Sequence, residues 1–129
     1  MDGYGQRVYS CLIVENEPLA IRMIEDCIAH RADLEVAGIA TELAELKEMV
    51  GRFVPDIIFL DFIIPPGNAQ GFHFGMLPKS SSIVVISAIP PHQFDGAQYL
   101  SNPYELLKPV SIVAFDRCME QVIADRNEE

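Results

Sequence analysis

Short, continuous apolar segments recur along this chain, separated by longer segments in which the apolar residues follow helical spacing. A continuous apolar run is typical of a parallel strand that is buried on both faces of a sheet. Such runs cover residues 8–14, 57–60 and 83–86, a shorter one covers 105–107, and an alternating segment at 34–39 fits an edge strand. The pattern therefore predicts five strands.

The intervening segments predict helices, because their apolar residues return every three or four positions. The predicted helices lie near residues 18–30, 42–53, 72–77, 93–100 and 112–126. Pro18 suits the first turn of the first helix, and Thr41 and Ser111 are the predicted N-caps of the second and last helices. Strands that alternate with helices in this way predict an α/β fold, with a right-handed, five-stranded parallel sheet and helices on both faces.

Composition narrows the possible class of protein. With 129 residues the chain suits one domain, and no apolar stretch approaches the roughly 20 residues of a membrane-spanning helix. Its net charge of −10 argues against direct nucleic-acid binding and favours a protein partner or a metal cation. Cys11, Cys27 and Cys118 lie within apolar patterns and are expected to be reduced core thiols of a cytoplasmic protein.

Polar side chains follow the apolar runs at the points where the predicted strands end. Asp61 closes the third run, Glu15 and Asn16 follow the first, Ser87 follows the fourth, and Lys108 follows the fifth. The carboxyl ends of neighbouring parallel strands meet at one edge of a sheet, which is where open α/β sheets bind ligands. A carboxylate at the end of a buried strand is costly unless it has a partner or a function. The sequence therefore predicts an acidic site that also holds a hydroxyl and a lysine.

Four motifs carry a resemblance to a known family: Val14-Glu15-Asn16-Glu17-Pro18-Leu19-Ala20, Ile58-Phe59-Leu60-Asp61-Phe62-Ile63-Ile64-Pro65, Ser87-Ala88 and Lys108-Pro109. In this order they resemble the receiver domain of bacterial two-component response regulators, particularly receivers of LytTR-type transcription regulators. The resemblance implies a flavodoxin-like, doubly wound sheet of strand order 2-1-3-4-5 with five flanking helices. It places the receiver domain at 8–126, after an N-terminal extension (1–7) and before a tail or linker start (127–129). It also implies a cis Lys108-Pro109 peptide bond.

The resemblance implies that Asp61 accepts a phosphoryl group from a sensor histidine kinase or a phosphotransfer protein. The chain is then a signalling domain and not an enzyme, apart from phosphotransfer to itself and slow loss of the phosphate. The phosphoryl group and the attacking carboxylate are both negative, so the site needs a divalent cation, normally Mg²⁺. Glu15, Asn16 and Asp61 are the candidate ligands. Lys108 and Ser87 are expected to bind phosphoryl oxygens.

Family receivers transmit phosphorylation through a switch that begins at the serine. Ser87, Tyr104 and Glu105 are the candidate switch positions, since the aromatic residue usual three places before the lysine is Glu105 here and Tyr104 precedes it. The fourth helix, fifth strand and fifth helix, about 93–126, are expected to form the output face and to support a homodimer. Tyr104, Glu105 and Asp116 are among the side chains expected to point outward there.

Several departures from the family pattern support an alternative function. Asn16 replaces an acid, which should weaken Mg²⁺ binding, and the loop after Pro65 is about two residues longer than usual. Pro90 and Pro91 stiffen the loop after the fourth strand. The alternative is an atypical pseudo-receiver that acts as a phosphorylation-independent interaction module. A flavin carrier of the same fold is disfavoured because no phosphate-binding loop follows the first strand. Glu17 is expected to support the first helix turn and not the metal.

Overall fold

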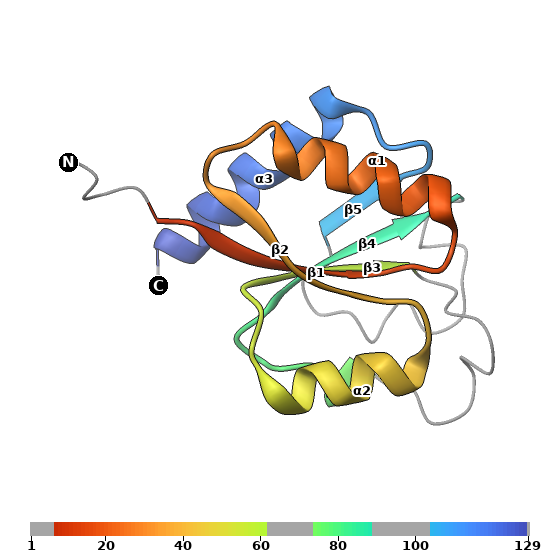
Figure 1. Ribbon diagram of the computed structural model, residues 1–129. Helices are drawn as coiled ribbons and strands as arrows, with labels where there is room; N and C mark the ends of the chain where they lie inside the picture. The colour runs from red at the N-terminus through yellow and green to blue at the C-terminus, as the bar shows by residue number, and fades with distance from the viewer. Residues whose placement is uncertain (1–6, 62–73, 89–103, 129) are drawn as a thin grey trace.

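A five-stranded parallel sheet forms the centre of the protein, as the computed structural model shows for residues 7–61, 74–88 and 104–128 (Figure 1). The strand order is β2-β1-β3-β4-β5, which confirms the predicted flavodoxin-like topology. The strands are β1 (Tyr9–Val14), β2 (Leu34–Ala40), β3 (Ile57–Asp61), β4 (Ser82–Ser87) and β5 (Tyr104–Leu107). Each predicted strand is therefore present, and its bounds differ from the prediction by one residue or none at each end.

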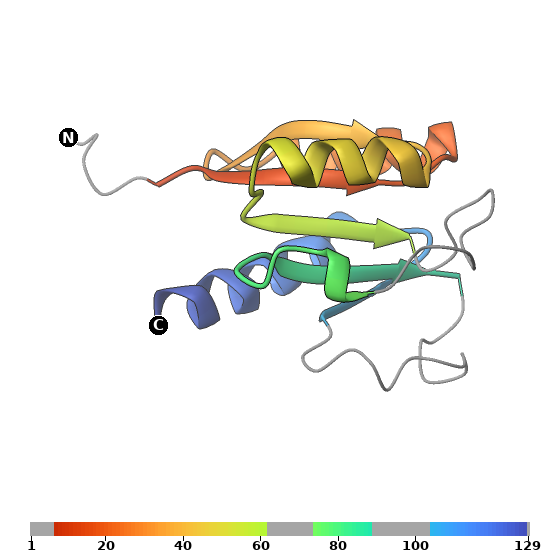
Figure 2. The ribbon, with the colours of Figure 1, turned by 90° about the horizontal axis from the view of Figure 1, so that it is seen from below.

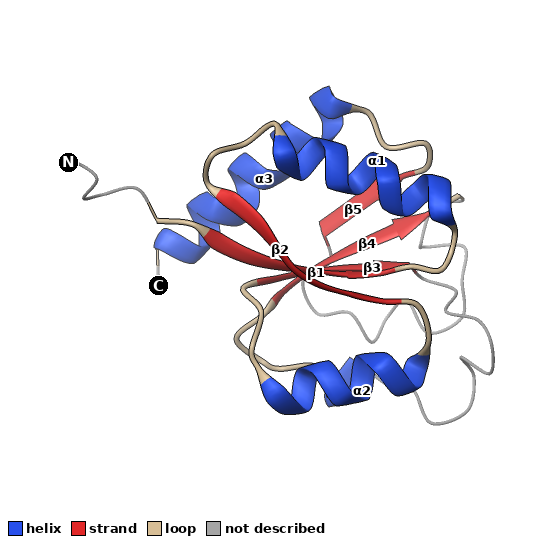
Figure 3. Cartoon of the chain, viewed as in Figure 1, coloured by secondary structure: helices blue, strands red, loops and turns tan. Residues whose placement is uncertain are grey.

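Helices cover both faces of this sheet, with α1 and α3 on one face and α2 on the other (Figures 1 and 3). Their bounds are α1 (Pro18–Ala29), α2 (Leu43–Arg52) and α3 (Ile112–Asn127), and a short 3-10 helix, η1, spans Phe74–Met76. The predicted helix at 93–100 lies outside the described residues. Among the described helices, none combines the length and the apolar character needed to cross a bilayer.

Two hydrophobic clusters, one on each face, explain why the strand sequences are continuously apolar. On β1, Cys11 and Ile13 pack toward α1 and α3, whereas Leu12 and Val14 pack toward α2. Successive side chains of a strand point to opposite faces, so a strand covered on both sides must be apolar at every position. The rings of Phe59 and Phe115, with centroids 5.4 Å apart, join β3 to α3.

The two predicted helix caps have different outcomes. Ser111 is the N-cap of α3, and its Oγ accepts a hydrogen bond from Ala114 N at 3.1 Å, which confirms the prediction. The prediction for Thr41 is wrong, because Glu42 occupies the N-cap position of α2 in an extended conformation. Thr41 lies one residue earlier, where its N and Oγ1 donate to Glu45 Oε1 at 2.6 and 2.7 Å.

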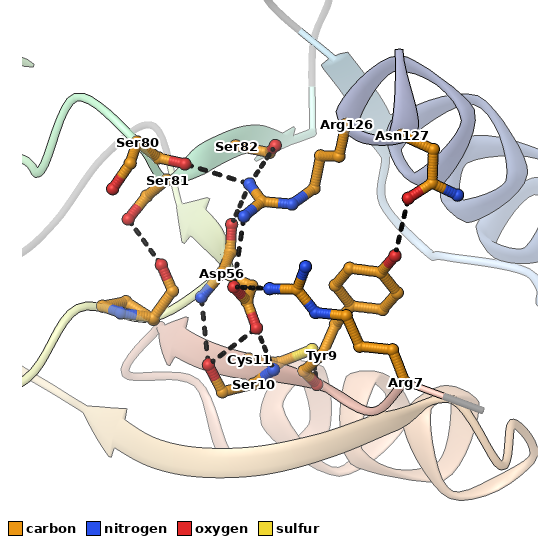
Figure 4. A network of polar contacts seen from close by, with 11 residues as sticks. Arg7, Tyr9, Ser10, Cys11, Asp56, Ser80, Ser81, Ser82, Arg126 and Asn127 are labelled. Atoms are coloured by element: carbon orange, nitrogen blue, oxygen red, sulfur yellow. Dashed lines mark hydrogen bonds and ion pairs between the residues drawn. The ribbon is translucent and has the colours of Figure 1, made fainter. Parts of the chain in front are cut away.

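A charged network around Asp56 joins the amino-terminal ends of β1, β3 and β4 to the last turn of α3 (Figure 4). The Asp56 carboxylate accepts hydrogen bonds from Ser10 N (2.9 Å), Arg7 (3.0 Å) and Arg126 (3.1 Å). The Nη1 atom of Arg126 donates at 3.0 Å to three oxygen atoms: Asp56 O, Ser80 O and Ser82 Oγ. This network holds the end of α3 against the sheet at the edge opposite the carboxyl ends of the strands (Figure 2).

The three cysteines are free, and their positions predict slow thiol reactivity. Cys11 and Cys27 are buried, as predicted, and Cys118 is half-buried. Burial raises the pKa of the Cys11 thiol to about 12 and that of Cys118 to about 11. Since the thiolate is the reactive form, Cys11 is almost entirely in the unreactive thiol form at pH 8.

We therefore expect a maleimide at pH 8 to leave Cys11 unmodified in the native protein and to label all three cysteines in urea. Peptide mapping by mass spectrometry identifies the labelled residues, and the urea-unfolded sample is the control for intrinsic reactivity. Labelling of Cys11 at the same rate in native and unfolded protein would show that this part of the core opens freely.

Candidate functional site

Four of the residues selected from the sequence lie at the carboxyl edge of the sheet. Asp61 is the last residue of β3 and Ser87 is the last residue of β4, while Glu15 and Lys108 directly follow β1 and β5. Figure 2 shows the arrowheads of these parallel strands at one edge. Backbone hydrogen bonds hold the two residues that follow strands: Glu15 N donates to Ala40 O at 3.0 Å, and Lys108 N donates to Ser87 O at 2.9 Å. The Lys108-Pro109 peptide bond is cis, as predicted.

Lys108 connects the acidic side chains of this edge. Its Nζ lies 3.1 Å from Glu15 Oε1, 3.6 Å from Glu17 Oε1 and 3.9 Å from Asp61 Oδ1. It also donates a hydrogen bond to Glu15 Oε2 at 3.3 Å. One ammonium group thus faces three carboxylates, so the group as a whole is negative and attracts a further cation.

Burial makes these interactions stronger than those of a surface ion pair. Only 2% of the Glu15 side chain and 12% of the Asp61 side chain are exposed, whereas Lys108 is 22% exposed and Glu17 60%. Burial by itself lowers the pKa of Lys108, but the hydrogen bond to Glu15 and the charges of Asp61, Glu15 and Glu17 outweigh it and raise that pKa above its ordinary value. Lys108 is therefore a cation at neutral pH.

The carboxylate of Glu15 has an oxygen that suits a metal ion. Its Oε2 accepts hydrogen bonds from Lys108 Nζ and from Glu17 N, the latter at 3.2 Å. Its Oε1 is buried and makes no hydrogen bond within the described part of the chain, although it forms the ion pair with Lys108. Mg²⁺ binds through one or two carboxylates and keeps several waters, so Glu15 and Asp61 fit this ion.

The structure does not supply a complete set of acidic metal ligands. In residues 7–61, 74–88 and 104–128, no three His, Cys, Asp or Glu side chains converge as a metal site. Asn16, the third candidate ligand, is exposed. Two carboxylates would therefore have to be supplemented by Asn16, by water or by the bound phosphoryl group.

Tyr104 and Glu105 lie on opposite faces of β5. Ser87 pairs with Leu107 in the sheet, so Glu105 is on the same face as Ser87 and Tyr104 is on the other. The Tyr104 hydroxyl donates to Asp125 Oδ2 of α3 at 2.5 Å, and the ring packs against the core under α1 and α3. The prediction that Tyr104 points outward is therefore wrong. The exposed Glu105 lies on the face of the sheet that also carries Ser87.

Glu17 is a site residue that the sequence analysis assigned to another role. It holds the N-cap position of α1 in an extended conformation, but its side chain makes no capping hydrogen bond and instead approaches Lys108. The spacing of Glu15 and Glu17 was the available signal, because alternate residues of an extended segment point to the same side. Preference for acids at helix N-termini favoured the other role.

An open cavity of about 360 Å³ adjoins the site between the start of α1 and the segment after β5. Its apolar lining includes Leu19, Met23, Ile86 and Val110, and Lys108 is at its edge. The Leu19 side chain is 74% exposed.

Comparison with known proteins identifies similar sequences, although no model of a protein family matches the chain. The transcriptional regulatory protein BtsR of Escherichia coli K12 is 26% identical over 121 residues, which cover 92% of this chain and 49% of BtsR. An uncharacterized response regulatory protein of Shewanella oneidensis is 24% identical over 118 residues, 91% of this chain and 44% of that protein. The chain thus spans about half the length of the curated relatives it matches.

Solved structures agree in fold. The response regulatory domain of the protein mrkE from Klebsiella pneumoniae superposes with a TM-score of 0.73 at 20% identity, and the match covers 93% of this chain and 99% of that domain. Such a match over the whole length of both chains shows a common topology. It does not test the narrower likeness to LytTR-type regulators, which stays a prediction.

Proposed function

We propose that this chain, which is a response regulator receiver domain, accepts a phosphoryl group on Asp61 from a histidine kinase or a phosphotransfer protein. The observation that carries the proposal is the position of Asp61 at the end of β3, with the ammonium of Lys108 3.9 Å from its Oδ1 and the buried Glu15 bound to the same ammonium. In the transfer, an Asp61 oxygen forms a bond to phosphorus, and the bond from phosphorus to the donor histidine nitrogen breaks. The nitrogen keeps the electron pair.

The other site residues have roles that follow from their charges. Lys108 can exchange part of its interaction with Glu15 for an incoming phosphoryl oxygen, and Ser87 can donate a hydrogen bond to another. Glu15 and Asp61 are the carboxylates that would hold Mg²⁺, whose contribution is to neutralise charge between the phosphoryl group and the attacking oxygen. The chain would thus act as a signalling domain rather than as an enzyme, in a cytoplasmic setting that suits its three free thiols.

The direct test is intact-mass spectrometry after incubation with acetyl phosphate and Mg²⁺. We expect a single added phosphoryl group in the wild-type protein and none in Asp61→Asn. Asp26→Asn is the matched control, because Asp26 is exposed on α1 and its carboxylate lies 3.7 Å from Arg22, away from the Lys108 cluster. Equal labelling of Asp61→Asn would assign the acceptor to another residue.

A pseudo-receiver is the alternative function, and two observations favour it. Asn16 provides an amide where receivers have an acid, and Glu105 provides a charge where they have an aromatic switch residue. Absence of labelling in the wild-type protein, with Mg²⁺ and with both acetyl phosphate and a phosphorylated donor protein, would support an interaction module that works without phosphate.

Output through the face of β5 and α3 and through residues 93–103, with homodimerisation, is part of the same proposal. Within the described part of this face, Asp116 is tied to Arg31 at 3.3 Å and Tyr104 to Asp125, so these side chains are less available than predicted. Leu107 is 52% exposed and Val113 63%, and they could contact a second copy. Sedimentation with and without beryllium fluoride tests the dimer, and a monomer in both conditions would exclude it.

A further inference from the structure

The segment that follows β1 carries two carboxylates on either side of the amide of Asn16. Glu15 is buried and Glu17 is 60% exposed, yet both side chains reach the same atom, Lys108 Nζ, at 3.1 and 3.6 Å. The Asp61 carboxylate reaches that atom from β3 at 3.9 Å. Glu17 therefore belongs spatially to the site, although it is not one of the metal ligands that the family pattern implies.

The Glu17 side chain is not engaged at the helix terminus where it is located. Glu17 is the N-cap residue of α1, but its carboxylate does not cap the helix. The backbone N of Glu17 instead donates a hydrogen bond to Glu15 Oε2, and this oxygen also accepts one from Lys108. The result is a buried Glu15 Oε1 with no hydrogen bond within the described residues. Glu15 is 2% exposed, and this oxygen, which lies 3.1 Å from the Lys108 ammonium, keeps lone pairs that can bind a further cation.

The balance of charge indicates the chemical class of such a ligand. Glu15, Glu17 and Asp61 bring three negative charges to one ammonium, so a divalent cation would neutralise the group. Mg²⁺ keeps several of its waters in proteins, and a carboxylate can then act through a water without direct contact. A long and partly exposed side chain such as Glu17 suits this role.

We propose that Glu17 supplies to the Mg²⁺ site the carboxylate charge that Asn16 does not. The proposal rests on the proposed function, because the cation matters biologically only if Asp61 is a phosphoryl acceptor. The contribution of Glu17 to Mg²⁺ affinity depends on residue 16. It is large because residue 16 is an amide, and it becomes smaller when residue 16 is an acid.

The test is a double-mutant cycle on Mg²⁺ affinity, measured by isothermal titration calorimetry without any phosphoryl donor. The four proteins are the wild type, Glu17→Gln, Asn16→Asp and the double variant, with folding checked by circular dichroism. We expect Glu17→Gln to weaken Mg²⁺ binding about tenfold in the wild-type background, as one partly screened charge at this range would. We expect Asn16→Asp to tighten binding, and Glu17→Gln to weaken it only about twofold in that background.

Glu42→Gln is the matched control. Glu42 is also an exposed N-cap residue that follows a strand at the carboxyl edge of the sheet, and its side chain likewise makes no capping hydrogen bond. Glu42→Gln should change Mg²⁺ affinity by no more than about twofold relative to the wild type, because Glu42 is not part of the Lys108 cluster. Equal weakening by Glu42→Gln would mean that overall charge, and not the site, sets the affinity.

The proposal is overturned if Glu17→Gln binds Mg²⁺ like the wild type, if its effect is the same in both backgrounds, or if none of the four proteins binds Mg²⁺. The outcome is separate from that of phosphorylation. Coupled Mg²⁺ binding without phosphorylation of Asp61 would keep the cation site and reject the phosphoryl-acceptor function. Phosphorylation of Asp61 without coupling between residues 16 and 17 would keep the phosphoryl-acceptor function and reject the role of Glu17.

Discussion

Replacing Lys108 by methionine is expected to lower the free energy of unfolding by about 3 kcal/mol at pH 7 without divalent cations. The substitution keeps most of the side-chain volume but removes the ammonium that lies 3.1 Å from Glu15. Glu15 is 2% exposed, and Asp61, at 12%, also faces this ammonium. Two buried carboxylates would then repel each other, and neither would be compensated by Lys108.

Urea unfolding followed by circular dichroism measures this loss. Lys47→Met is the control, because Lys47 is exposed on α2, and we expect it to change stability by no more than about 0.5 kcal/mol. Added Mg²⁺ should restore part of the stability of Lys108→Met and much less in the wild type, since the cation would replace the lost ammonium. An unfolding free energy equal to that of the wild type would mean that the Lys108 ion pairs contribute nothing net.

The second large effect is expected at the opposite edge of the sheet, where Asp56→Ala should destabilise the protein by about 3 kcal/mol. The Asp56 carboxylate accepts hydrogen bonds from Arg7, from Arg126 and from the backbone and hydroxyl of Ser10. The Arg126 side chain is only 18% exposed, so loss of the Asp56 carboxylate leaves a mostly buried positive charge without this partner. Arg126 keeps its bonds to backbone oxygens, which limits the loss.

A double-mutant cycle distinguishes this network from a general effect of mutation. Arg126→Met should also destabilise the protein, and the double variant should be at least about 1 kcal/mol more stable than the sum of the single effects predicts. Asp26→Ala removes an exposed carboxylate that lies 3.7 Å from Arg22, and it should cost no more than about 0.5 kcal/mol. Additive effects of Asp56 and Arg126 would show that the two side chains do not stabilise each other.

The pattern of apolar and polar residues was enough to predict the parallel sheet and the edge at which the site lies, while the family resemblance supplied the strand order. Each strand is a local apolar run, and residues 83–86 were predicted where β4 spans Ser82–Ser87. Burial on both faces requires apolar residues at every position, so the pattern reports the environment directly. Polar residues that end such runs, as Asp61 and Ser87 do, must then gather where the parallel strands end.

Only the tertiary structure decided which polar groups meet. Lys108 is paired with Glu15 across 93 residues of sequence, Arg126 with Asp56 across 70, and Tyr104 turns to Asp125 on α3. A periodic pattern states whether a side chain is buried, but a charged group in an acidic region has several partners in reach. The packing of the helices and strands selects among them, because it sets the distances that determine each Coulomb energy and hydrogen bond. For this reason only the tertiary structure showed that the Glu17 carboxylate lies beside Lys108.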